Sequence, residues 1–71
     1  MKITTYADAD QFARDYAWED TQPTIEDPEY AASEILSALD AEEQVALDVR
    51  GHLHAALVAS AERENARRTT S

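Results

Sequence analysis

The chain has 71 residues, no cysteine and a net charge of −9 at neutral pH. A chain this short forms one domain at most, and without cysteine it has neither a disulfide nor a thiolate metal site to stabilise a small core. Its negative charge argues against direct binding to nucleic acid or to an anionic membrane, since both attract basic surfaces. The sequence has no apolar segment of membrane-spanning length and no signal-peptide pattern, so we expect a cytoplasmic protein.

The first part of the chain predicts a short arm and one helix. Residues 1–7 carry a weak strand pattern over a short span, and we expect them to form an extended N-terminal arm. Asp8 is the expected N-cap of the first helix, with Gln11 completing a capping box. Trp18 follows Arg14 by four residues and could stack on it. One apolar face at helical spacing comprises Ala9, Phe12, Ala13, Tyr16 and Ala17.

A polar, acid-rich connection leads to a second predicted helix, from Pro28 to about Leu39. Asp27 is its expected N-cap, and Pro28 stands at the first helical position, where its missing N–H costs nothing. Asp40 then opens a capping box that predicts the start of a third helix directly afterwards. The inward face of the second helix comprises Ala31, Ala32, Ile35, Leu36 and Leu39.

The third predicted helix is the longest element, and it extends from Asp40 to Arg67 without a proline. At about 1.5 Å per residue it would be roughly 40 Å long, too long for the rest of the chain to cover. We expect residues 66–71 to be a disordered tail. Residues 1–71 thus form one all-α, three-helix bundle-like domain. The buried face of the long helix comprises Ala46, Val49, Leu53, Ala56 and Leu57.

No residue pattern indicates catalysis or metal binding. His52 and His54 point about 200° apart on a helix, so they cannot bind one metal ion from the same face. Acid–base chemistry by a carboxylate pair needs a pocket that shifts one pKa, and a thin, alanine-rich core leaves little room for one. We therefore expect a protein that is not an enzyme and that has no cofactor and no metal.

Acidic residues are concentrated in the first two-thirds of the chain. Between Ile3 and Val49 there are thirteen acids and one base, Arg14, a net charge of −12, whereas Arg50 to Ser71 carry +2. Acids three or four positions apart on a helix lie about 5–6 Å from each other and form rows of negative charge, as the phosphates of DNA do. An acidic surface that serves only solubility is the simpler interpretation. A net charge of −12 over a span with one basic residue, however, exceeds what solubility requires.

The chain resembles the small, acidic, mostly helical inhibitors encoded by phages, which include anti-CRISPR proteins and DNA mimics. The resemblance lies in the short chain that begins MKIT, the lack of cysteine, and the acidic run from Asp8 to Asp48. It implies a protein of the host cytoplasm that binds a CRISPR effector complex, where it covers a basic DNA-binding surface or blocks recruitment of a nuclease.

We therefore predict an inhibitor that binds the basic, nucleic-acid-binding surface of another protein, with aromatic anchors inside an acidic rim. The tail arginines, Arg63, Arg67 and Arg68, would then have to point away from the docking face. The predicted partner-binding residues are Asp8, Asp15, Trp18, Glu19, Asp20, Glu26, Asp27, Glu29 and Tyr30.

The alternative hypothesis is a helical interaction or regulatory module, homodimeric or antitoxin-like, whose acidity serves only solubility. A second row along the third helix could make its dimer contact, because small residues there allow another helix to approach closely. The residues of this predicted dimer face are Leu47, Gly51, His54 and Val58.

Overall fold

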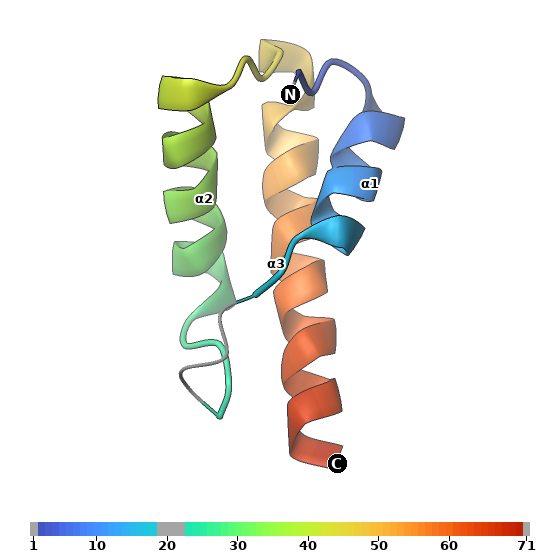
Figure 1. The fold of residues 1–71 in the computed structure, drawn as a ribbon, viewed down its shortest axis with the longest axis vertical. Helices are drawn as coiled ribbons and strands as arrows, with labels where there is room; N and C mark the ends of the chain where they lie inside the picture. Colours follow the sequence, from blue (N-terminus) through green and yellow to red (C-terminus); the bar gives the residue numbers. More distant parts are fainter. Residues whose placement is uncertain (1, 19–22, 71) are drawn as a thin grey trace.

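Three helices form the described part of the protein, and the longest of them contacts both others (Figure 1). The computed structural model describes residues 2–18 and 23–70. The helices are α1 (Tyr6–Asp15), α2 (Pro28–Glu42) and α3 (Leu47–Thr70). Within the described residues α1 and α2 both pack on α3, and their backbones do not approach each other closely. The predicted all-α fold with a long C-terminal helix is confirmed.

The core lies where α3 meets the two shorter helices. Val49, Leu53 and Leu57 of α3 are buried, as their helical spacing predicted. The residues that α1 and α2 bury against them are alanines, namely Ala9, Ala13 and Ala32. Small side chains at these positions let the helices approach α3 closely but bury little apolar surface. The largest fully buried side chains therefore come from α3 and from Ile3 of the N-terminal segment.

α1 begins before the position that the sequence suggested. The side chain of Thr5 caps the helix, because its Oγ1 accepts a hydrogen bond from the backbone N–H of Asp8 at 3.1 Å. The prediction that Asp8 is the N-cap is therefore wrong. Asp8 lies instead in the first turn, where its negative charge stabilises the positive end of the helix dipole. Threonine and aspartate are both good N-caps, so their preferences alone did not decide between them.

The start of α2 agrees with the prediction from the sequence, and its end does not. Asp27 is the N-cap and Pro28 follows it, as predicted. The helix continues past Leu39 to Glu42, so the prediction that Asp40 caps the third helix is wrong. No glycine or proline stops the helix at Asp40, and its carboxylate forms an ion pair with Arg50 of α3 instead.

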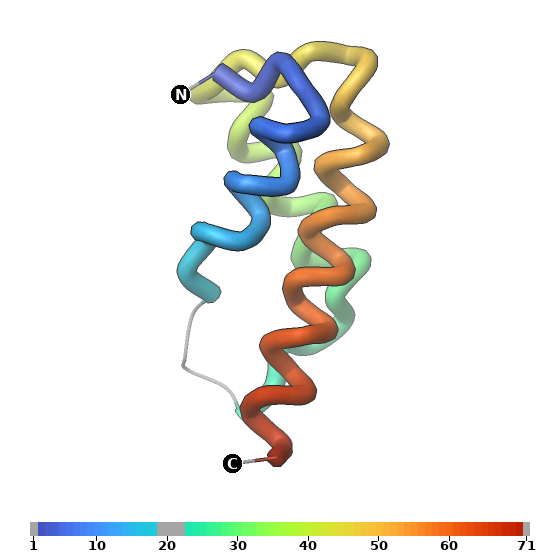
Figure 2. Tube along the Cα trace, turned by 90° about the vertical axis from the view of Figure 1, so that its right-hand side faces the viewer, coloured from blue at the N-terminus to red at the C-terminus, as the bar shows by residue number. Residues whose placement is uncertain are grey.

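The N-terminal segment is extended, and it is paired with the connection between α2 and α3 (Figure 2). The backbone N–H of Ile3 donates to the carbonyl of Gln44, and the N–H of Ala46 donates to the carbonyl of Ile3, both at 3.1 Å. The Ile3 side chain is fully buried. This pairing holds residues 43–46 extended, and α3 therefore begins at Leu47 rather than at Asp40.

The C-terminal residues are helical where we expected disorder. α3 continues through Thr70, so residues 66–70 are not a disordered tail, and Ser71 lies outside the described residues. Two contacts explain this extension. The Asn65 side chain bonds both the N–H and the carbonyl of Ile25, and the Arg68 side chain donates to the carbonyl of Trp18.

The buried side chain of Ile3 provides a test of the N-terminal pairing. We expect Ile3→Ala to lower the free energy of unfolding by about 2–5 kcal/mol, because it leaves a cavity under the α2–α3 connection. Lys2→Ala removes the exposed neighbouring side chain and should change stability by less than about 0.5 kcal/mol. Urea denaturation followed by circular dichroism measures both. Equal stability of the two variants would contradict the pairing.

Candidate functional site

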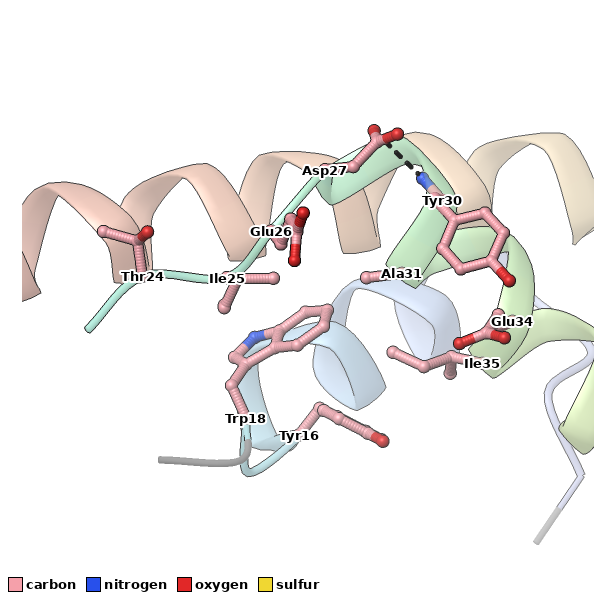
Figure 3. A pocket seen from close by; sticks show the side chains of 10 residues that line it. All are labelled: Tyr16, Trp18, Thr24, Ile25, Glu26, Asp27, Tyr30, Ala31, Glu34 and Ile35. Atoms are coloured by element: carbon pink, nitrogen blue, oxygen red, sulfur yellow. Dashed lines mark hydrogen bonds between the residues drawn. The ribbon is translucent and has the colours of Figure 1, made fainter. Parts of the chain in front are cut away.

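A cleft of about 690 Å³ lies between the end of α1, the segment before α2 and the first turns of α2 (Figure 3). It lies where the backbones of α1 and α2, which both pack on α3, are not close to each other. Its walls are aromatic, aliphatic and acidic, and none of its described lining residues is basic. The aromatic lining residues are Tyr16, Trp18 and Tyr30, and the acidic ones are Glu26, Asp27 and Glu34. Thr24, Ile25, Ala31 and Ile35 complete the lining.

Trp18 forms one wall of the cleft, and its orientation is fixed by two hydrogen bonds in series. The indole Nε1–H donates to the hydroxyl of Ser60 at 3.1 Å, and that hydroxyl donates to the backbone carbonyl of Ala13 at 3.0 Å. The carbonyl belongs to the last turn of α1, where helix carbonyls lack a partner within the helix. The Tyr16 ring packs edge-on against the indole, with centroids 5.0 Å apart.

The acidic wall is built around the start of α2. Asp27 adopts a left-handed backbone conformation, with φ of 46°, and its side chain accepts a hydrogen bond from the N–H of Tyr30 at 3.3 Å. Aspartate tolerates this conformation better than most residues. A hydrogen bond to Glu34, reinforced by the negative charge of that residue, raises the pKa of the Tyr30 phenol above its ordinary value. Both carboxylates therefore lie beside Tyr30, and all three residues line the cleft (Figure 3).

Arginines gather in a separate hollow that shares Tyr16 and Trp18 with the cleft. This hollow is lined by Arg14, Arg63, Glu64 and Arg67, along with Ser60 and the two shared aromatic residues. Arg14, on which we expected Trp18 to stack, donates to the side chain of Gln11 instead. Two of the tail arginines, Arg63 and Arg67, thus line a different hollow from the one that the acids line.

Glu64 connects these arginines to one another. Its carboxylate accepts from Nε of Arg67 at 3.0 Å and from Nε of Arg68 at 3.2 Å. The hydrogen bond from Arg67 is the main cause that lowers the pKa of Glu64 to about 2, against an opposing effect of burial and with further help from Arg68. The basic end of α3 is therefore partly neutralised by its own helix.

The structure brings together only some of the predicted partner-binding residues. Four of the nine line the cleft: Trp18, Glu26, Asp27 and Tyr30. Three lie on helices outside it: Asp8, Asp15 and Glu29. Glu19 and Asp20 lie outside the described residues.

Six of the ten lining residues were not predicted as site residues: Tyr16, Thr24, Ile25, Ala31, Glu34 and Ile35. Two of them illustrate different reasons. Glu34 follows Tyr30 by one helical turn, and this spacing could have identified it. Ile25 is placed by its two hydrogen bonds to Asn65, forty positions away, and no local pattern indicates that contact.

The residues of the predicted dimer face differ in exposure: two are open to solvent and two contact the rest of the chain. Leu47 is 83% exposed, and a side chain added at Gly51 would meet nothing within 4 Å. His54, in contrast, lies 3.3 Å from the hydroxyl of Ser33 on α2, and Val58 packs against the core. Two of the four residues therefore make contacts within the chain, and the other two remain open to solvent.

The two histidines have separate neighbours. His52 lies 2.7 Å from a carboxylate oxygen of Asp10, and its ring packs against Tyr6 with centroids 4.8 Å apart. Among the described residues no group of three histidine or acidic side chains is arranged to hold a metal ion.

No helix in the described part of the chain is both long enough and apolar enough to cross a membrane. Comparison with protein-family models, curated proteins and solved structures found no match.

The hydroxyl of Ser60 provides a test of how the Trp18 wall is held. We expect Ser60→Ala to lower the free energy of unfolding by about 1–3 kcal/mol, because it leaves the indole N–H and the Ala13 carbonyl without their partner. Ser37→Ala, at an exposed position of α2, should change stability by less than about 0.5 kcal/mol. Urea denaturation measures both, and an equally stable Ser60→Ala protein would contradict this role.

Titration of Glu64 tests the arginine contacts at the end of α3. Its lowered pKa means that its contribution to stability is present above about pH 4.5 and is lost as pH falls toward about 2. Arg67→Gln should move the NMR titration midpoint of the Glu64 side chain upward, toward 4.5. Arg63→Gln makes the same change of charge without removing the contact and should leave the midpoint in place. A midpoint near 4.5 in the unmodified protein would exclude the contact.

Proposed function

We propose that this protein is a non-enzymatic inhibitor that binds a basic surface of a nucleic-acid-binding protein and keeps nucleic acid away from it. The observation that carries this proposal is the cleft, where three aromatic and three acidic side chains surround a space with no basic lining residue among those described. Aromatic side chains supply much of the binding energy at protein interfaces, and a charged rim gives specificity and a fast association rate.

The pairing of the acidic residues supports the same function. Asp40 is paired with Arg50, so α3 neutralises part of the acidic surface. Glu26, Asp27 and Glu34 have no ion pair with a basic side chain of the described residues. Their negative charge is therefore available to the basic groups of another protein.

The resemblance to phage-encoded inhibitors suggests the class of partner. A CRISPR effector complex holds nucleic acid in positively charged channels, which are surfaces of the required sign. We accordingly propose that the protein acts in the host cytoplasm, where it covers such a surface and blocks DNA access or nuclease recruitment.

The alternative function, a homodimeric or regulatory helical module, is favoured by one observation. Leu47 is a large apolar side chain that is 83% exposed at the start of α3, beside the open position of Gly51. Light scattering of the unmodified protein and of Leu47→Glu separates the two functions. A dimer that Leu47→Glu converts to a folded monomer would support the alternative.

Competition for DNA tests the proposed function directly. A CRISPR effector complex loaded with guide RNA should lose binding of its target duplex, measured by gel mobility, when the protein is added. Reversing three exposed or half-buried acids outside the cleft, Asp8→Lys, Asp15→Lys and Glu29→Lys, should weaken this competition at least about tenfold, and added salt should weaken it further.

Glu62→Lys provides the control, because this exposed residue of α3 lies outside the acidic first two-thirds of the chain. It should leave competition unchanged. Competition that resists both the triple reversal and high salt would contradict an electrostatic contact, and a lack of competition across effector classes would overturn the proposed partner.

A further inference from the structure

We infer that the cleft binds the guanidinium group of an arginine side chain that the partner protein presents. This inference rests on the proposed function and deepens it by naming the group that enters the cleft.

The aromatic rings provide flat surfaces for a planar cation. Trp18, Tyr16 and Tyr30 line the cleft, and Figure 3 shows the indole facing the space between α1 and α2. A guanidinium group stacks on aromatic faces, and tryptophan attracts cations most strongly of the aromatic side chains. The hydrogen bond from the indole to Ser60 holds the ring in place before a ligand arrives. Little conformational entropy would therefore be lost on binding.

The carboxylates provide the acceptors that a guanidinium requires. Asp27 accepts a hydrogen bond from the backbone N–H of Tyr30, and Glu34 lies beside the phenol of the same residue (Figure 3). A carboxylate has about four acceptor positions, so each retains capacity for a ligand. Glu26 also lines the cleft and is exposed. Arginine carries five donors in a planar fork and can bond two carboxylates at once, whereas lysine is a point charge.

The arginine of the chain that contacts Trp18 does so from outside the cleft. Arg68 has a side chain that is 7% exposed, donates to the backbone carbonyl of Trp18 and is paired with Glu64. The cleft offers aromatic rings and carboxylates, but no arginine of the described chain lines it. An arginine from another protein is therefore the complementary occupant.

Trp18 is the only tryptophan of the chain, so its fluorescence reports directly on the cleft. The probes are a short capped peptide with a single arginine and the same peptide with citrulline, which keeps the shape and loses the charge. At constant ionic strength the arginine peptide should change the emission saturably, a lysine peptide should bind more weakly, and the citrulline peptide should produce no change.

Two variants remove carboxylates of the cleft without changing their size. Glu26→Gln and Glu34→Gln should each weaken the arginine peptide about tenfold, the loss expected for one charge-assisted hydrogen bond. Glu62→Gln makes the same chemical change on the exposed surface of α3 and should leave affinity unchanged. Circular dichroism verifies that all three variants keep their helices.

An equal response to arginine and citrulline, or unchanged affinity in both cleft variants, would overturn the inference. The DNA competition assay separates this failure from failure of the proposed function. If both cleft variants displace DNA as well as the unmodified protein does, the arginine site is wrong and the inhibitor function stands. If the arginine peptide binds as expected and DNA is never displaced, the site stands and the inhibitor function is wrong.

Discussion

The hydrogen bonds from Trp18 through Ser60 to the carbonyl of Ala13 are the contact on which the shape of the candidate site depends. The backbones of α1 and α2 approach only α3 closely, so the separation of the two short helices depends on how each packs on α3. Ser60, which is 8% exposed, connects both the end of α1 and the indole of Trp18 to α3 through hydrogen bonds. The aromatic residues after α1 therefore form a rigid wall facing the start of α2.

The same wall separates two regions of opposite charge. Tyr16 and Trp18 belong both to the cleft with its three acids and to the hollow lined by arginines. Glu64 pairs with Arg67 and Arg68 on α3 and so keeps the basic end of the helix occupied. A chain with a net charge of −9 thus concentrates unpaired acid near aromatic groups, which is the combination that favours a basic protein partner.

Local patterns in the sequence predicted most of the fold and part of the site. The apolar spacing identified the buried face of α3, and Asp27 before Pro28 identified the start of α2. Contacts between distant segments could not be predicted in this way. Ile3 pairs with the α2–α3 connection, and Asn65 bonds Ile25. Because of these contacts α3 begins later and ends later than the sequence predicted. The cleft depends on such contacts, so the sequence indicated Trp18, Glu26, Asp27 and Tyr30 without showing that they meet.

The most direct test of the central claim is a map of backbone and indole NMR signals during titration with the capped arginine peptide. The claim predicts that the largest shifts belong to the indole Nε1–H of Trp18 and to the amides of Glu26, Asp27, Tyr30 and Glu34. The amides of Asp8, Asp15 and Glu62, which do not line the cleft, should move little. Shifts of similar size at all exposed acids would contradict the claim, because they would indicate diffuse attraction without a site.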